Sequence, residues 1–174
     1  MIGRTIGRYR IVAKLGEGGM GSVWKAEDTV IRRHVALKFL SQELANSPQA
    51  RARFLREAQA AGSVDHPGVE TVHDVGEAGG LVYITLRLVQ GETVAQSLAR
   101  EGALRLPDAV AIGMAAADAL IHAHARGILH RDISARNLMI GDDGQVVVVD
   151  FGLAFAEGAS RNGPRASGGP GLKA

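Results

Sequence analysis

The sequence of 174 residues contains no cysteine, and only 4% of its residues are aromatic. Without cysteine the chain has neither disulfides nor thiolate metal ligands, and this composition suits a reducing cytoplasm. No apolar run approaches the roughly 18 residues of a membrane-spanning helix, and the N-terminus lacks the apolar core of a signal peptide. We therefore expect a cytoplasmic protein that neither spans a membrane nor is exported.

A surplus of either charge is also lacking, since 20 basic and 18 acidic residues give a net charge of +2. Residues 158–174 hold three of the 20 bases and none of the 18 acids, which leaves 17 against 18 and a net charge of −1 in the rest. A body without a basic surplus has no electrostatic footprint for nucleic acid. We expect a globular protein that does not bind nucleic acid.

Apolar alternation predicts strands in the first half of the chain. The predicted strands comprise residues 9–15, 22–26, 34–40, 69–75 and 81–89. Between the third and fourth, Ser47 followed by Pro48 is typical of a helix start, and Gly62 is typical of its end. Residues 1–90 are thus expected to form a five-stranded antiparallel unit with one helix.

After Gly91 the apolar period lengthens toward 3.6, which predicts helices. Residues 93–100 form a short one, and Pro107 begins a long one that is apolar nearly all round, so we expect it to be buried. Seven of the 17 residues from 158 to 174 are Gly or Pro, which predicts a disordered tail. The second unit, residues 91–157, is expected to be mainly helical and incomplete.

Residues 16–23 have the spacing G-x-G-x-x-G-x-V. Dinucleotide-binding folds share the first six positions, but in those folds a helix follows the last glycine. Here residues 22–25 alternate as a strand, so the glycines are expected at a hairpin tip. Because glycine has no Cβ, its backbone N–H can approach phosphate oxygens closely. Gly16, Gly18 and Gly21 are therefore candidate phosphate-binding residues. An ordinary glycine hairpin is the alternative.

Lys38 stands among apolar residues of the third predicted strand, where its ammonium can act as a point charge on phosphates. Glu57 follows 19 residues later, on the apolar-leaning face of the predicted helix. A carboxylate on such a face needs a cation, and Lys38 is the natural one, with Glu43 a less well placed partner for it. A solvated pair of Glu57 with Arg53 or Arg56 is the alternative.

Residues 130–137 have the pattern H-R-D-x-x-x-x-N, and the triplet D-F-G begins 13 residues after Asn137, at Asp150. The two motifs in this order are the protein-kinase signature. In that chemistry Asp132 accepts or orients the proton of an attacking hydroxyl. Asn137 and Asp150 would hold Mg²⁺ ions that bridge the phosphates of ATP, since sparse oxygen ligands suit this ion.

Over residues 9–156 the chain resembles bacterial serine/threonine protein kinases of the eukaryotic-like type. The supporting stretches are residues 15–26, 54–58, 130–137 and 150–154. The resemblance implies a bilobal kinase fold of the α+β class, ATP and Mg²⁺ bound where the lobes meet, and a protein hydroxyl as the acceptor. It ends at the start of the activation segment, so the chain is expected to be a kinase domain truncated after the D-F-G motif.

The resemblance also predicts the nucleotide pocket. Val23, Ala36 and Met139 would sandwich the purine ring, although each alone fits plain core better, so this assignment depends wholly on the motifs. Leu86 takes the gatekeeper place, and the backbone of residues 87–89 would bind adenine. The full predicted nucleotide-binding set is Leu15, Gly16, Gly18, Gly21, Val23, Ala36, Lys38, Leu86, Arg87, Val89 and Met139.

Three histidines suggest a metal site, and we reject that interpretation. His122 and His124 are two residues apart on a helix, so their rings point about 200° apart, and no acidic ligand is suitably spaced. We expect both to be partly exposed. The third, His130, is expected to pack under residues 150–152.

Three positions depart from the family pattern. Ser134 replaces the lysine usual in serine/threonine kinases, and the loop looks more like the tyrosine-kinase form, in which an arginine at the place of Arg136 compensates. Arg87 replaces a common hinge acid. Glu70 stands where relatives begin a strand with an apolar residue, so its carboxylate must reach solvent or find a partner.

Two functions follow from these observations. The first is an ATP-dependent protein kinase, with serine or threonine the favoured acceptor over tyrosine, acting on an unidentified protein. The second is a nucleotide-binding pseudokinase or interaction module that is inactive through truncation. Without the later helices of the family, apolar surface around Val110 and Met114 would face water, and such patches drive self-association.

Overall fold

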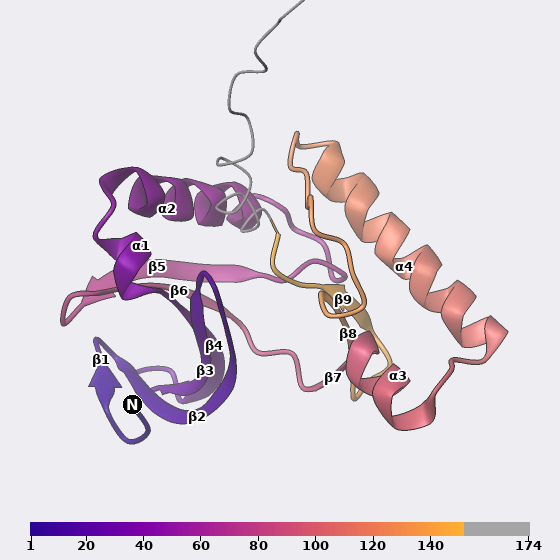
Figure 1. Ribbon diagram of the computed structural model, residues 1–174, viewed down its shortest axis with the longest axis horizontal. Helices are drawn as coiled ribbons and strands as arrows, with labels where there is room; N and C mark the ends of the chain where they lie inside the picture. The colour runs from indigo at the N-terminus through magenta and orange to yellow at the C-terminus, as the bar shows by residue number, and fades with distance from the viewer. Residues whose placement is uncertain (152–174) are drawn as a thin grey trace, which may run out of the picture.

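The computed structural model describes residues 1–151, in which an antiparallel sheet and a smaller sheet with two helices lie side by side (Figure 1). The first sheet has six strands in the order β1-β2-β3-β4-β6-β5, and every neighbouring pair is antiparallel. Its strands are β1 (Thr5–Ile6), β2 (Tyr9–Gly18), β3 (Gly21–Asp28), β4 (Arg33–Leu40), β5 (Val72–Ala78) and β6 (Leu81–Arg87).

Strand β4 shows why both faces of this sheet are buried. Its residues alternate between two apolar clusters, because successive side chains on a strand point to opposite faces. Val35, Leu37 and Phe39 belong to one cluster, with Tyr9 and Tyr83. Ala36 and Leu40 belong to the other, beneath the helices. Lys38 therefore shares the helix-side face, as the alternation predicts.

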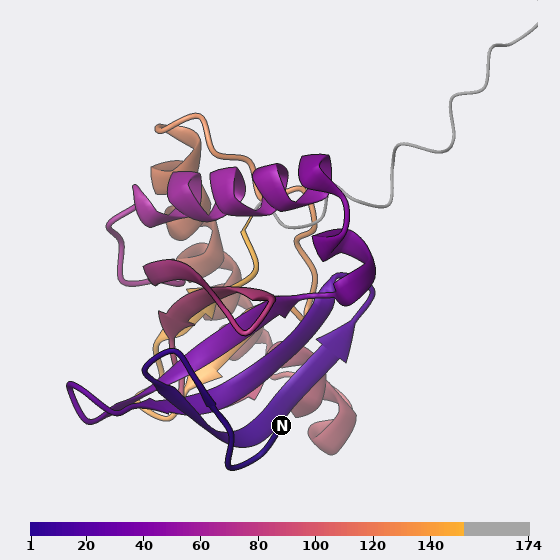
Figure 2. The same cartoon turned by 90° about the vertical axis from the view of Figure 1, so that its left-hand side faces the viewer.

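Two helices cover that face (Figure 2). Helix α2 (Pro48–Gly62) begins as the sequence predicts, with Pro48 in the first turn and the Ser47 hydroxyl accepting a bond from the Ala50 N–H. It buries Phe54 and Ala58 against the sheet. Its neighbour, α1 (Gln42–Ala45), is a single turn capped by Ser41.

The first unit differs from the predicted five strands and one helix by two short elements. Strand β1 and helix α1 have two and four residues, too few for alternation or a 3.6 period to register. Strand β5 also begins at Val72 rather than at residue 69. Val69 instead makes an isolated parallel bridge with Val148, which joins the two halves of the chain.

The second unit contains a three-stranded sheet in the order β7-β8-β9 and two helices. These elements are β7 (Gly91–Thr93), α3 (Val94–Glu101), α4 (Leu106–His124), β8 (Leu138–Gly141) and β9 (Val146–Val148). Helix α3 begins with a capping box between Thr93 and Gln96. Helix α4 starts one residue earlier than predicted, and Gly127 follows it with a φ of +74°.

Helix α4 is buried along one stripe only, contrary to the expectation of burial nearly all round. Its inner stripe, which includes Ala116 and Ala119, packs on Val148 and Phe151. Val110 and Met114 on its outer side are 51% and 69% exposed, which confirms the expectation that this apolar surface faces water. Within residues 1–151 it is the one helix whose length and mean hydropathy of 1.3 would permit a membrane crossing, a test that core helices of soluble domains also pass.

The predicted disordered tail at residues 158–174, and the end of the predicted second unit, lie outside the described residues.

Candidate active site

A cavity of about 790 Å³ opens between the β2–β3 hairpin and the second sheet, and its wall gathers residues from position 15 to position 150. All eleven residues of the predicted nucleotide-binding set lie on this wall, together with Arg136, Glu70 and Asp150. Two predicted catalytic side chains, Asp132 and Glu57, and the predicted metal ligand Asn137 are not among the described residues that line it.

The roof of the cavity is the glycine hairpin, which the structure places at the tip of β2 and β3 as the sequence predicts. Gly18 pairs with Gly21 across the turn. Gly21 has a φ of +144°, and a Cβ there would lie 1.9 Å from the carbonyl oxygen of Phe39. Only glycine allows β3 to approach β4 this closely, so the position is fixed by the fold itself.

Lys38 lies on the floor of the cavity and is 7% exposed. Its Nζ donates a hydrogen bond to Asp150 Oδ1 at 2.6 Å, an ion pair across 112 residues of sequence. The ion-pair partner of Lys38 is thus Asp150, and the predicted ion pair between Lys38 and Glu57 is absent from the described residues. The helical spacing fixes the face on which Glu57 lies, but not the distance of α2 from β4.

Glu57 is half-buried on the inner side of α2. Burial raises the pKa of its carboxyl above the ordinary value of 4.5, and the positive charges of Arg53, Arg131 and Lys38 act in the opposite direction. Lys38 is thus within electrostatic reach of Glu57. The catalytic role of Glu57 stays a prediction.

Asp132 and Asn137 are joined directly. The side-chain amide Nδ2 of Asn137 donates to the carbonyl oxygen of Asp132 at 2.8 Å and to its carboxylate Oδ2 at 3.0 Å. The backbone N–H of Val149 donates to the carbonyl of Asn137, which ties this loop to the strand leading to Asp150. Asp132 itself is exposed, so its carboxylate is accessible to another molecule.

His130 packs under the D-F-G segment, as predicted, with its ring 4.7 Å from that of Phe151. It is 1% exposed, and its Nε2 donates to the carbonyl of Val149 at 2.8 Å. Its Nδ1 accepts the N–H of Asp132 at 3.3 Å. One tautomer satisfies both contacts, so His130 is a structural link between the loop and the strand.

Two residues of this region have a left-handed backbone although they are not glycine. Arg131 has a φ of +68° and Asp150 a φ of +63°. Such conformations persist where the surroundings fix them, and they gather at functional sites.

Glu70, the acid at a position where an apolar residue was expected, has a hydrogen-bond partner in the cavity. Its Oε2 accepts the backbone N–H of Asp150 at 3.1 Å. Burial, and next the negative charge of Asp150, raise the pKa of Glu70 to about 7. The hydrogen bond from the Asp150 backbone N–H and then the charges of Lys38 and Arg87 act in the opposite direction. Glu70 was absent from the predicted site, and the signal that pointed to it was an acid at an apolar position.

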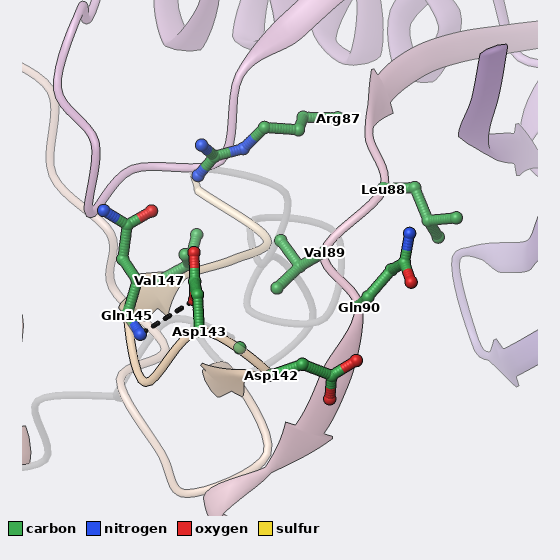
Figure 3. A pocket seen from close by; sticks show the side chains of 9 residues that line it. Arg87, Leu88, Val89, Gln90, Asp142, Asp143, Gln145 and Val147 are labelled. Carbon is green, nitrogen blue, oxygen red and sulfur yellow. Dashed lines mark hydrogen bonds between the residues drawn. The ribbon is translucent and has the colours of Figure 1, made fainter.

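The hinge between the units begins at Arg87. Its Nη2 donates to the carbonyl oxygen of Pro67 at 2.9 Å, which ties the hinge to the turn before β5. Behind the hinge lies a pocket of about 340 Å³, where the Arg87 side chain extends toward the β8–β9 hairpin that carries Asp143 and Gln145 (Figure 3). No glycine-loop or catalytic-loop residue within residues 1–151 lines this pocket, whereas the cavity of about 790 Å³ is lined by the glycine hairpin and by Arg136.

A second polar cluster joins His66, Asp118 and His122, whose ligand atoms lie within 4.8 Å of one another and could hold a metal ion by distance. The prediction that no acid is suitably spaced is wrong, because Asp118 lies four residues before His122. His66 Nδ1 accepts the Gly68 N–H at 3.1 Å, so its Nε2 carries the proton donated to Asp118 Oδ2 at 3.0 Å. His122 Nδ1 donates to the Asp118 carbonyl at 3.0 Å. The hydrogen bond between His66 and Asp118 thus joins the turn at residues 66–68 to helix α4.

A twisted antiparallel sheet with a glycine hairpin, a floor lysine and an H-R-D loop beside D-F defines a kinase-like phosphotransferase fold. The family model described as "Protein kinase domain" matches residues 9–166. The chain belongs to the protein kinase domain family.

Individual relatives agree with the predicted resemblance to bacterial serine/threonine kinases. The serine/threonine-protein kinase PknE of Mycobacterium bovis is 44% identical over 154 residues, which are 88% of this chain and 27% of the relative. The serine/threonine-protein kinase PrkC of Bacillus subtilis is 40% identical over 157 residues, 90% of this chain and 24% of the relative. The chain therefore spans about a quarter of the length of these relatives.

Solved structures give the same fold. The kinase domain of PknI from Mycobacterium tuberculosis superposes with a TM-score of 0.78 at 36% identity, and the match covers 89% of this chain and 62% of that one. A structure described as the PpkA-294 apo form superposes with a TM-score of 0.77 at 24% identity, which speaks for the fold alone.

Proposed function

We propose that this chain binds Mg-ATP in the cavity beneath the glycine hairpin and transfers the γ-phosphoryl group to a hydroxyl of a protein, with serine or threonine favoured. The observation that carries the proposal is the contact of 2.6 Å between Lys38 and Asp150 on the wall of that cavity. It sets a cation for phosphate oxygens beside a carboxylate suited to Mg²⁺.

The residues present fit the metal. Asn137 uses its amide Nδ2 twice on Asp132, which leaves its amide oxygen as the atom available to a hard cation. The carboxylate of Asp150 supplies the other oxygens. When bound, the ion offsets charge on the phosphates. Asn137 and Asp150 are therefore the residues that would hold it.

The chain's own residues supply the remaining chemistry. With nucleotide bound, Lys38 would exchange Asp150 for phosphate oxygens, and the N–H groups of the glycine hairpin would donate to the phosphates as well. Asp132, held by Asn137, aligns the acceptor hydroxyl and takes its proton. The hydroxyl oxygen forms a bond to the γ-phosphorus, the bond from that phosphorus to the bridging oxygen breaks, and ADP leaves.

The position of Arg136 is consistent with its replacing the lysine that is missing at Ser134. It is exposed and lies on the wall of the cavity, whereas Ser134, two residues after Asp132, has no charge to offer a phosphate. We assign to Arg136 the role of the cation that lysine has in most serine/threonine kinases.

The second candidate is a nucleotide-binding pseudokinase or interaction module, and Ser134 is the feature that favours it. Transfer of radiolabelled γ-phosphate to a generic protein acceptor, with Asp132→Asn as control, separates the two. Transfer that is lost in the variant supports a kinase. An upward melting shift with Mg-ATP and no transfer supports the binding module.

We also propose that the chain acts in the cytoplasm, where ATP is available, and that it self-associates through the outer side of α4. That side exposes Leu106, Val110, Met114 and Ile121, at 78%, 51%, 69% and 64%. An exposed apolar stripe on a helix favours association in water.

A further inference from the structure

Glu70 lies at the one place where the two units of the described chain are hydrogen-bonded in parallel. The N–H of Val148 donates to the Gly68 carbonyl at 2.8 Å, and the N–H of Glu70 donates to the Val148 carbonyl at 3.0 Å. The third bond of this ladder uses a side chain, since Glu70 Oε2 accepts the N–H of Asp150 at 3.1 Å. The segment before β5 therefore holds the backbone of the D-F-G aspartate.

Asp150 needs such a support. Strand β9 ends at Val148, so the N–H of Asp150 lies beyond the regular ladder of the second sheet. Its φ of +63° is unfavourable for a residue with a Cβ. A half-buried backbone donor also requires an acceptor, and a carboxyl oxygen of Glu70 provides it.

The side chain of Asp150 is fixed at the same time from the other side. Its Oδ1 accepts from Lys38 at 2.6 Å, and Glu70 lines the same cavity as both residues. Lys38 and Glu70 thus hold Asp150 through its carboxylate and its main chain respectively. The charged groups that face Glu70 are Asp150, Lys38 and Arg87.

We propose that Glu70 is a positioning residue, which orients Asp150 for metal-bound nucleotide by accepting its backbone N–H. An apolar residue at this place would offer no acceptor to that N–H. The consequence for metal rests on the proposed function, whereas the backbone contact does not. Two measurements separate them.

The variants are Glu70→Gln, which keeps an acceptor oxygen at the same distance along the side chain, and Glu70→Leu, which fills the space without one. Glu77→Leu is the matched control, since it removes an exposed carboxylate of β5 that pairs with Arg51 on the surface. Each is made in the full chain. The affinity for ATP is measured by calorimetry, with Mg²⁺ and with EDTA.

We expect all four proteins to bind metal-free ATP equally within about twofold. The gain in affinity on adding Mg²⁺ should be kept in Glu70→Gln and Glu77→Leu. It should fall roughly three- to tenfold in Glu70→Leu, the size expected for loss of one ordinary hydrogen bond. A full gain in Glu70→Leu overturns the proposal, and so does an equal loss in both Glu70 variants.

Hydrogen exchange of the Asp150 amide, without metal or nucleotide, tests the contact itself. Protection should be the same in the wild-type chain and Glu70→Gln and fall about tenfold or more in Glu70→Leu. Unchanged protection overturns the proposal whatever the affinities are. If no protein gains affinity from Mg²⁺ while the exchange result holds, the proposed function fails and the backbone contact stands.

Discussion

Lys38 Nζ lies 2.6 Å from Asp150 Oδ1, although 112 residues separate them in the sequence. The lysine side chain is 9% exposed and the aspartate side chain 38% exposed. A buried ammonium is costly without a counter-charge, so Asp150 neutralises Lys38 while no phosphate is bound. In the proposed function a nucleotide and a divalent ion replace this contact with two new ones, and neither charge is left unpaired.

The pair should be detectable as a coupling energy. Lys38→Met and Asp150→Asn, alone and combined, are compared by urea denaturation without nucleotide. Because Asp150 is partly solvated, we expect a coupling of about 1–2 kcal/mol rather than the larger value of a fully buried pair. Both single variants should also lose phosphoryl transfer. A coupling energy near zero would mean that the contact between Lys38 and Asp150 does not stabilise the chain in solution.

The local part of this site could be predicted from the sequence. Alternation along β4 gives the face of Lys38, and the strand pattern after Gly21 distinguishes a phosphate hairpin from a dinucleotide fold. The cap at Ser47 gives the start of α2. Each of these inferences depends on neighbours within a few residues, where periodicity and capping chemistry act.

The long-range contacts could not be predicted in this way. The partner of Lys38 depends on how far α2 stands from β4 and on where residue 150 lies, and local patterns hold neither distance. The same limit applies to the contact between Glu70 and Asp150 and to the hydrogen bond between His66 and Asp118. The sequence shows that Glu70 is an acid at an apolar position. It does not show that the partner of Glu70 is the backbone N–H of Asp150, because that contact depends on the tertiary fold.

The glycine hairpin provides a matched pair of substitutions. Gly21→Ala should destabilise the chain by at least about 2 kcal/mol and weaken ATP binding, because its φ of +144° and a carbonyl 1.9 Å from the new Cβ both oppose it. Gly18→Ala adds a methyl to open space and should fold normally. Thermal melts with and without Mg-ATP compare the two. Equal melting temperatures would contradict the strain argument.

Stability should depend on pH through Glu70. Its pKa is about 7 in the folded chain, above the ordinary value of 4.5. Between these values the folded state binds the proton more readily. The contribution of Glu70 to stability is therefore fully present below about pH 4.5 and is lost as pH rises through 7. In Glu70→Gln this contribution disappears. Melting curves in metal-free buffer from pH 5 to pH 8 measure it, and parallel profiles for the two proteins would refute it.

The outer side of α4 should govern the state of association. Met114 is 69% exposed and makes little contact within the described chain, so Met114→Glu should change the free energy of unfolding by no more than about 0.5 kcal/mol. The charge should nevertheless oppose burial between copies, and we expect light scattering to show a lower average mass than for the wild-type chain. Ala119→Glu is the contrasting variant, because Ala119 is fully buried against β9 and its replacement should unfold the chain. A wild-type chain that is a monomer at all concentrations, with a cooperative melt, would show that this apolar stripe is tolerated in water.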